Sequence, residues 1–459
     1  MGPIAVAITF AATFMSAATF VGMPGHAYQS GLSVLFFHSG QWFPCAISLI
    51  ILTKVYRKLA GRLKSLSLPD WIGRRYDSNF LRIFTALVTL LMVVQIGSQL
   101  AGVGTVLENI AGVPYRWGVV IAVLIIMFYL CVGGTYAHIY TNIVQGAMVV
   151  AAGVVIFISG FFVFGNIFTE VPALLAAEDP LLVAPTSSYN GAYGSFWAIF
   201  GIYITHIWWT LNPHQINKFQ YLKSEKDIRK FIIFTCIFIF VGALTQVSGL
   251  YTRALVGASL DKIDNAAVTY LSLVFPKAFA ALLTVIILAA VMSTTDGIMV
   301  YLATVLGNEL YMNGLVKGKE SRGVKIDWAR EEKIALRICQ FGVIAVGLIG
   351  LPIALKRPAS ISTLLWVGNG GVMGGVAGPI ILGLFNKRTG KAAAIAGSVC
   401  GFAGFMVLYF GGIVTAVYLA NALGGLISVG VTFVCTYIFK PMPEEKIDFL
   451  FGEVEETPL

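Results

Sequence analysis

Long apolar runs recur about twelve times along this chain, and they restrict the fold more than any other feature of the sequence. A helix needs about 20 apolar residues to cross the hydrocarbon core of a bilayer. The runs reach this length, and they lack the ten-residue alternation typical of membrane β-barrels. Charged residues make up only 12% of the 459 residues, whereas about 25% is usual in a soluble domain. We therefore expect an all-α integral membrane protein with spans near residues 4–24, 33–54, 80–108, 117–133, 139–164, 193–212, 230–257, 276–310, 334–355, 361–385, 391–410 and 413–439.

The positive charges mark one side of the membrane. The net charge is +9, but the basic residues lie in loops beside the spans, which argues against a nucleic-acid partner. Lys and Arg concentrate in the loops after the second, sixth, eighth and tenth spans, with Lys356 and Arg357 as the main exception. Cytoplasmic loops carry such an excess. The pattern predicts a multi-pass protein of the cell membrane with both termini in the cytoplasm, in contact with lipid and without an obligate protein partner.

Two spans carry signs of interruption. The first contains Gly22, Pro24 and Gly25, and the sixth contains Pro213 near its inner end. The two lie five spans apart, as in transporters built from two inverted repeats around a site near the midplane. Ordinary Gly and Pro kinks, which membrane helices tolerate, are the alternative. The expected organisation is one transmembrane domain over residues 1–440, with repeats at 4–164 and 193–385, two further helices at 391–440 and a short acidic tail at 441–459.

The eighth span places three hydroxyls and a carboxylate, in AAVMSTTDG (residues 289–297), in the middle of an apolar run. Ala290, Ser293 and Thr294 follow i, i+3, i+4 spacing, so they share one helix face. Two hydroxyls and a backbone carbonyl form half of a cage for a small hard cation, and an unwound first helix would supply the other oxygens. Such hydroxyls more often bond the preceding turn or a neighbouring helix. The Asp296 carboxylate cannot return a hydrogen bond to its own helix as a hydroxyl can, and an ionised group in hydrocarbon costs at least roughly 2.5–3.5 kcal/mol.

Four segments, in this order, resemble the sodium:solute symporter family. They are FMSAATFVGMPGHAYQSGLS (14–33), GGTYAHIYTNIVQ (133–145), LNPHQINKFQYLKS (211–224) and AAVMSTTDGIMVYLATVLGNELY (289–311). They look like the family's first core helix, its GGxxAxxxTDxxQ signature, the exit of its sixth core helix and its eighth core helix. The resemblance implies the LeuT-type fold, a five-plus-five inverted repeat with discontinuous first and sixth core helices. It also implies sodium-driven uptake by alternating access.

The resemblance further implies a sodium site. Carried over position by position, the site would use the backbone carbonyls of Ala12, Met15 and Ala290. The hydroxyls of Ser293 and Thr294 would complete it. Five oxygens without a carboxylate suit a weak, reversible coupling site. Na⁺ is then the bound coupling ion, and no organic cofactor is expected.

The solute is expected just beyond the break in the first core helix. Ser16 and Thr19 fall where some relatives hold substrate, and a half-helix N-terminus there could hold a carboxylate through free N–H groups and its dipole. A hydrogen bond back to its own helix is the alternative role for Thr19. A lone membrane histidine is more often a packing residue than a ligand. Further candidates for the cavity lining are His38, Gln41, His206 and Asn212.

The chain departs from the family pattern at positions that bear on coupling and on the solute. Asn142 stands where the signature carries an aspartate that supports an extra sodium ion in some members. Asp296 could supply that carboxylate, could titrate and admit proton coupling, or could be a structural partner of a neighbouring helix. Ser98 stands where some acid-transporting relatives place an arginine. Gln95 and Gln99 flank it and are candidates for hydrogen bonds to the solute.

The expected function is sodium-coupled import of a small organic solute. The stretches MSAATFVG and STTDG look most like members that carry small carboxylates, namely monocarboxylates or pantothenate-like acids. A proline-type amino-acid symporter or a proton-coupled variant is the alternative. A transporter-like solute sensor is a remote alternative, because the chain ends at Leu459 without a signalling domain. No HExxH, Walker or GxSxG motif appears in a suitable context, so no enzyme activity is expected.

Overall fold

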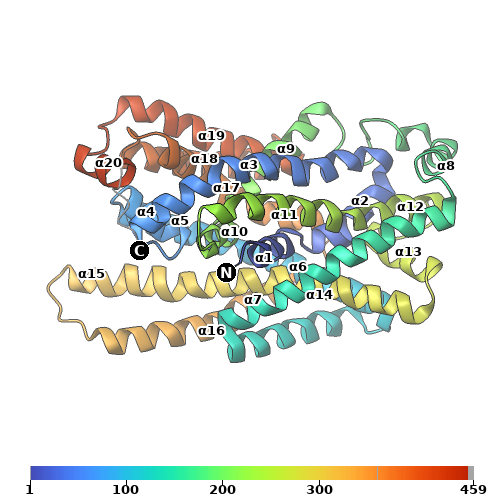
Figure 1. Cartoon of the computed structure of the whole chain (residues 1–459), viewed down its shortest axis with the longest axis horizontal. Coiled ribbons are helices and arrows are strands. Elements are labelled where there is room, and N and C mark those ends of the chain that lie inside the picture. The colour runs from blue at the N-terminus through green and yellow to red at the C-terminus, as the bar shows by residue number, and fades with distance from the viewer. Residues whose placement is uncertain (1, 359, 453–459) are drawn as a thin grey trace.

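The computed structural model describes residues 2–358 and 360–452, without the side chains of residues 110, 134–137 and 139, and every regular element within them is helical (Figure 1). Within the described residues, ten helical stretches are long and apolar enough to cross a membrane. Two shorter apolar helices, α1 (Pro3–Phe14) and α9 (Phe196–Trp209), begin the two spans that were expected to be interrupted. The all-helical membrane fold predicted from the apolar runs is confirmed.

The remaining elements follow in chain order, and α7 contains two spans, 115–133 and 140–164. The longer helices are α3 (Leu35–Leu63), α5 (Asn79–Thr89), α6 (Val93–Ala111), α7 (Tyr115–Phe164), α11 (Lys226–Ala243), α12 (Val247–Val256), α14 (Lys277–Thr304), α16 (Trp328–Leu355), α17 (Ile361–Phe385), α18 (Lys391–Phe410) and α19 (Val417–Ile438). The shorter helices are α2 (Met23–Ser30), α4 (Leu68–Arg75), α8 (Glu170–Glu178), α10 (Pro213–Ile216), α13 (Ala266–Val274), α15 (Lys317–Glu320) and α20 (Glu444–Phe451). Single turns and irregular helical segments are η1 (Ala18–Gly22), η2 (Gly31–Val34), η3 (Leu90–Met92), η4 (Pro180–Leu182), η5 (Asn217–Tyr221), η6 (Leu244–Gln246), η7 (Ile263–Asn265) and η8 (Val305–Val316).

The first span breaks upstream of its Gly and Pro residues. Met15, at the end of α1, has an extended backbone with φ −86° and ψ 128°. The chain then resumes as the π-helical segment η1 and continues directly into α2. Pro24 is the second residue of α2, and the helical path passes through it without a break. The interruption expected within residues 11–25 is therefore real, and it lies at residues 15–17, upstream of Gly22, Pro24 and Gly25.

The sixth span breaks where Pro213 predicts. α9 ends at Trp209, and Pro213 is the first residue of α10, preceded by the extended backbone of Asn212 at φ −54° and ψ 133°. A residue before proline is pushed out of the helical region, so Asn212 ends the preceding helix naturally. At the other end of α9, the Ser195 side chain caps the helix by accepting a hydrogen bond from the Ala198 N–H at 3.2 Å.

Both halves of the first span are enclosed by other helices. α1 packs against α7, α11 and α14, while α2 packs against α12. The approach of α2 to α12 requires glycine, because a Cβ on Gly249 would lie 1.9 Å from the carbonyl oxygen of Pro24. A Cβ on Gly25 would likewise lie 2.9 Å from the carbonyl oxygen of Ile263. These contacts hold the second half of the first span firmly against α12 and η7.

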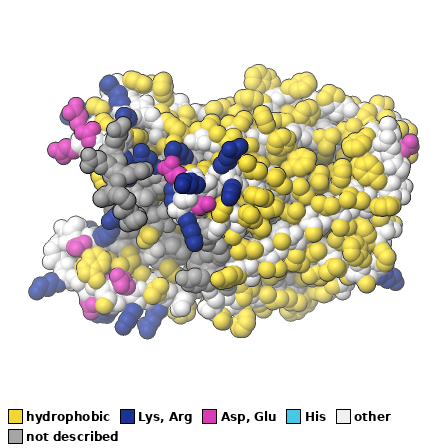
Figure 2. Space-filling model, in the orientation of Figure 1, with side chains coloured by type: hydrophobic (Ala, Val, Ile, Leu, Met, Phe, Trp, Pro, Cys, Tyr) yellow, Lys and Arg dark blue, Asp and Glu magenta, His cyan; other side chains and the backbone are white. Residues whose placement is uncertain are grey.

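The surface has a broad apolar belt, and Lys and Arg gather mainly at one end of the molecule, on the left in Figure 2. We call this the basic end. Of the acidic tail expected at 441–459, residues 444–451 form the helix α20 at this end. The guanidinium of Arg62 donates to the carbonyl oxygens of Leu450 and Gly452 at 2.6 and 2.7 Å, which caps α20. The tail is thus partly folded against the basic end.

Candidate functional site

The five oxygens expected to bind sodium converge between α1 and α14. The Ser293 hydroxyl lies 2.9 Å from the carbonyl oxygen of Ala12 and 2.7 Å from that of Ala290. The Thr294 hydroxyl donates to the carbonyl oxygen of Met15 at 2.8 Å. All five residues are at most 3% exposed. Oxygens from two separate helices therefore face one another in a buried place.

The break in the first span is what makes two of these carbonyls available. In a continuous helix, Ala12 and Met15 would accept from the N–H groups of Ser16 and Thr19. Instead, the Ser16 N–H donates to the Thr19 hydroxyl at 3.3 Å, and the Thr19 N–H donates to the Ser16 carbonyl at 2.8 Å. The Thr19 hydroxyl therefore caps the start of the next helical segment, which differs from the alternative role of a bond back along its own helix.

A group of glutamines surrounds the break. The Gln99 side chain accepts the Ala17 N–H at 2.6 Å, and the Gln41 side chain donates to the Thr19 hydroxyl at 3.3 Å. Gln246, in turn, donates to Gln41. Four buried amide atoms here have no hydrogen-bond partner among the described residues: both side-chain polar atoms of Gln95, Nε2 of Gln99 and Oε1 of Gln246. The cluster thus retains hydrogen-bonding capacity that a solute could use.

Three expected lining residues make other contacts. The Ser98 hydroxyl donates to the carbonyl oxygen of Ile361 at 2.7 Å. Nδ1 of His206 lies 2.7 Å from the carbonyl oxygen of Ile202 in its own helix, and its ring packs among aromatic side chains. His38 is half-buried, with its ring centroid 5.2 Å from that of Phe240. The structure gives these three a packing or helix-linking environment rather than a place in the glutamine cluster.

Asn212, at the break in the sixth span, pairs with another amide. Its Nδ2 donates to Oδ1 of Asn369 in α17 at 2.6 Å. Both residues are fully buried, and within the described part of the chain Oδ1 of Asn212 and Nδ2 of Asn369 have no partner. This pair links the second broken span to α17, which also packs against η1.

Asp296 and Asn142, the two coupling candidates, meet through a histidine. Nδ1 of His138 lies 2.8 Å from Oδ1 of Asp296, and the Tyr129 hydroxyl donates to Oδ2 at 3.0 Å. Nδ2 of Asn142 lies 3.3 Å from each ring nitrogen of His138. Gly297 leaves room for this ring, since a Cβ there would lie 2.9 Å from Cε1 of His138. The carboxylate that is costly in the sequence is therefore hydrogen-bonded by α7.

A buried lysine lies on the side of α1 that faces α10. Nζ of Lys218 donates to the Thr9 carbonyl at 2.9 Å and also to the Thr13 hydroxyl. Lys218 and His138 both line a cavity of about 310 Å³, together with Ser67 and other residues of the basic end. The cavity connects the surroundings of Asp296 with that end of the molecule.

Sequence reasoning missed Gln246, Asn369, His138, Tyr129 and Lys218. Some signal was present: Gln246 is an amide in an apolar span, and Asn369 interrupts a run of small residues. His138 lies inside the signature segment itself. Their partners, however, lie more than 150 residues away in all five cases, so only the packing reveals what each one contacts.

Comparison with known proteins identifies the family. The family model described as "Sodium:solute symporter family" matches residues 1–401. The chain belongs to the sodium:solute symporter family. Sodium-coupled transport of a small solute is the activity that this membership supports.

Individual relatives are similar over most of the chain. The sodium/pantothenate symporter of Escherichia coli (strain K12) is 27% identical over 411 residues, covering 89% of this chain and 82% of that protein. The sodium/proline symporter of Staphylococcus aureus is 26% identical over 415 residues, covering 87% and 77%. The osmoregulated proline transporter OpuE of Bacillus subtilis (strain 168) is 23% identical over 473 residues, covering 99% and 91%.

Solved structures agree on the fold. A Na⁺-coupled sialic acid symporter in a substrate-bound outward-open state superimposes with a TM-score of 0.75 at 19% identity, covering 97% of this chain and 91% of that one. Mhp1, a nucleobase-cation-symport-1 family transporter, gives a TM-score of 0.60 at 14% identity, covering 99% and 96%. The LeuT-type fold expected from the four sequence segments is confirmed.

Proposed function

We propose that this chain imports a small organic solute together with sodium, and that the ion binds between α1 and α14. The observation that carries the proposal is the convergence of the Ser293 and Thr294 hydroxyls on the carbonyls of Ala12 and Met15. To bind Na⁺, each hydroxyl would turn its proton away so that its oxygen and the neighbouring carbonyl both face the ion. Hard cations prefer oxygen ligands of this kind.

The test is sodium-dependent uptake by the double variant Ser293→Ala, Thr294→Ala. An interaction with a charged partner is worth about 1.5–3 kcal/mol, so the sodium concentration for half-maximal uptake should rise by roughly ten- to a hundredfold. Thr295→Ala is the matched control, because Thr295 is buried on the same helix but donates to Val291 within it. Unchanged sodium dependence in the double variant, at normal expression, would refute the site.

The solute is proposed to carry a carboxylate and to bind beside η1, among Ser16, Thr19, Gln41, Gln95 and Gln99. The helical dipole at the start of η1 and the unpartnered amides of the glutamine cluster support this placement. A monocarboxylate or a pantothenate-like acid is the first candidate, and the name of the E. coli relative agrees with it. A proline-type amino acid is the second, favoured by the names of other relatives and by the outer cavity described below.

A thermal-shift screen of the purified protein distinguishes these solutes. Short monocarboxylates, pantothenate and proline would each be added with and without Na⁺, because a ligand that binds the folded state raises apparent stability by mass action. The proposal predicts at least one acid whose stabilisation needs sodium. Stabilisation by none of them, or equal stabilisation without sodium, would contradict it.

We propose Asp296 as the residue that decides the coupling. It could bind a second cation, carry a proton or serve as a fixed hydrogen-bond partner of His138 and Tyr129. The proposed organisation retains two repeats at 4–164 and 193–385, with α18 and α19 as additional helices. In the cell membrane, the basic end would face the cytoplasm together with both termini, as the distribution of Lys and Arg supports. The solute is moved without chemical conversion, and no obligate protein partner is proposed.

A further inference from the structure

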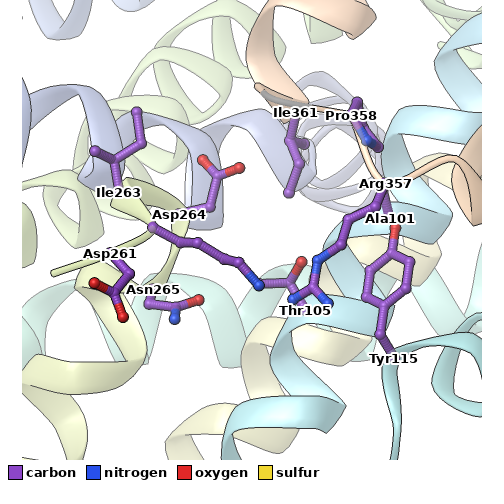
Figure 3. Close-up of a pocket in the computed structure, with 11 residues that line it drawn as sticks. Ala101, Thr105, Tyr115, Asp261, Ile263, Asp264, Asn265, Arg357, Pro358 and Ile361 are labelled. Carbon is purple, nitrogen blue, oxygen red and sulfur yellow. The ribbon is translucent and has the colours of Figure 1, made fainter.

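A second polar cavity, of about 280 Å³, lies away from the glutamine cluster at the end of the bundle opposite the basic end (Figure 3). The cavity lies at that end because α16 starts near the basic end, and Arg357, which lines the cavity, follows the opposite terminus of α16. The walls come from α6, the start of α7, the loop around η7 and the segment before α17. Its polar lining includes Thr105, Tyr115, Asp261, Lys262, Asp264 and Arg357. Ligand pockets for drug-sized molecules occupy about 300–1,000 Å³, so this cavity suits a smaller solute.

Asp264 is the unusual residue in this cavity. It is only 9% exposed, and within the described ranges its Oδ1 has no hydrogen-bond partner. Burial raises the pKa of Asp264 to about 7, against a smaller opposing contribution from a hydrogen bond with the Ile361 backbone. A buried carboxylate with one oxygen lacking a donor, and without a counter-ion, lowers stability. Such a group is retained at a cost unless a ligand supplies the missing partner.

The neighbouring cations do not supply a partner for the Asp264 carboxylate. Arg357 is paired through both of its terminal nitrogens with Glu108, and its guanidinium lies 4.5 Å from the centre of the Tyr115 ring. That leaves Lys262 as the one remaining cation in the described lining, against the carboxylates of Asp261 and Asp264. The balance is negative, which disfavours a simple monoanion and favours a ligand that brings its own positive group.

We propose that this cavity is an outer binding site for a zwitterionic amino acid, on the route of the solute to the glutamine cluster. Oδ1 of Asp264 would accept an N–H of the protonated amine, and Lys262 would face the carboxylate. The inference rests on the proposed function, and it favours the second candidate solute, a proline-type amino acid, over acids that carry no ammonium group.

The position of the loop supports a role in solute access. η7 packs against η1 and α2, where Gly25 allows the backbone of Ile263 to approach. On the opposite wall, the Ile361 carbonyl accepts from Ser98, which neighbours the glutamines of α6 in sequence. An amino acid bound to Asp264 would therefore lie between the elements that lead to the break in the first span.

The same geometry predicts a pH dependence of binding. Asp264 must be ionised to hold an ammonium group, so amine binding should strengthen as pH rises through the region of its pKa near 7. The charged or titratable groups around it are Asp261 and Lys262 in its own loop, Glu108 on α6, Tyr115 on α7 and Arg357 before α17. Of these, Glu108 and Arg357 neutralise each other, which leaves Asp264 as the group best placed to respond.

The experiment is equilibrium binding of L-proline to the purified full-length protein at pH 8 without sodium. Tetrahydrofuran-2-carboxylate, in which oxygen replaces the ring amine, is the matched probe. Proline should bind, and the oxygen analogue should bind at least about tenfold more weakly, because it leaves the carboxylate without its donor. Equal binding of the two probes, or no sodium-independent proline binding, would overturn the proposal without any need for a variant.

Two variants locate the site. Asp264→Asn should weaken proline binding by at least about tenfold, whereas Glu170→Gln, which changes an exposed carboxylate on α8 outside the cavity lining, should change it less than about twofold. Proline binding unaffected by Asp264→Asn would overturn the assignment. The Ser293→Ala, Thr294→Ala variant separates the two proposals. If it keeps normal sodium dependence of uptake, the ion site fails, while loss of proline binding in Asp264→Asn would still support the outer cavity.

Discussion

At the residue scale, the ion site depends on where individual hydrogen bonds end. The carbonyls of Ala12 and Met15 accept no hydrogen bond within their own helix, because the N–H groups of Ser16 and Thr19 donate elsewhere. The Ser293 and Thr294 hydroxyls occupy these carbonyls, and so satisfy buried polar groups that would otherwise be costly. The same atoms can serve an ion, since hydroxyls can exchange a donated hydrogen bond for coordination.

Asp296→Asn should alter coupling more than folding. The amide keeps an oxygen that can accept from Tyr129 or from His138, so the contacts between α14 and α7 are preserved in part. Loss of the negative charge should lower the maximal sodium-driven uptake and change its pH profile. Uptake by proteoliposomes at several pH values measures both. An unchanged sodium stoichiometry and pH profile would mean that Asp296 is structural.

Asp264→Asn should make the protein more stable at pH 8. The folded protein raises the pKa of this carboxyl from 3.8 to about 7, so folding binds its proton more tightly. The resulting penalty is absent below about pH 4, grows as pH rises and is complete above about pH 7. The melting temperature in detergent should therefore increase at pH 8 and increase less at pH 5. Asp261→Asn is the control, and an equal effect of the control would contradict this account.

The shared face of Ala290, Ser293 and Thr294 on α14 could be predicted from helical periodicity alone, whereas the ion half-site built on that face stays a proposal. The function of Asp296 could not be predicted in the same way. Its surroundings depend on His138 and Tyr129, which are more than 150 positions earlier in the chain. Likewise, no local pattern distinguishes the partnered Gln99 from Gln95, although both lie on α6.

At the element scale, the break in the first span is maintained from outside the helix. The sequence predicted an interruption within residues 11–25, and the family resemblance placed it just before Ser16, although the conspicuous Gly and Pro residues lie downstream. Pro24 is compatible with the first turn of α2 and does not break the chain. The position of the break instead reflects tertiary contacts, in which α6 and α14 supply partners for the backbone groups of residues 12–17.

Gln99→Leu should weaken the start of η1. The Ala17 N–H loses its acceptor, and an unsatisfied buried donor costs about 1–3 kcal/mol. Thermal unfolding in detergent should show a lower melting temperature for this variant. Gln95→Leu, on the same helix, should leave stability unchanged or raise it, since neither amide atom of Gln95 has a partner among the described residues. Equal losses in the two variants would argue against a capping role for Gln99.

At the scale of the whole molecule, the last segment is bound to the loop after the second span. Besides the Arg62 cap, Nζ of Lys446 donates to the Arg74 carbonyl and pairs with Asp77. Composition alone suggested an acidic tail, but the contacts that hold α20 join Arg62 to backbone carbonyls of the tail, and Lys446 of the tail to Arg74 and Asp77, which lie far away in sequence. The helix α20 is thus held against the basic end of the bundle.

Arg62→Ala should release α20. The variant removes the donors to the carbonyls of Leu450 and Gly452, so residues 444–452 should become more sensitive to limited proteolysis. We expect little change in sodium affinity, because the ion site lies between other elements. Lys58→Ala, at an exposed position on the same helix, is the control. Equal protection of α20 in both variants would show that the cap contributes nothing measurable.

The paired packing of the first and seventh spans has a mechanical consequence. α1 lies against α11, α2 lies against α12, and both pairs are joined at one depth, where η6 contacts η1 and α2. Each pair would rotate as a stiff rod about this shared hinge. Ala12 lies near the end of α1, and Met15 lies at the hinge itself. An ion that binds both carbonyls and the α14 hydroxyls would therefore fix the hinge angle. Slower amide exchange at residues 15–20 on sodium addition would report this stiffening, and exchange independent of sodium would argue against it.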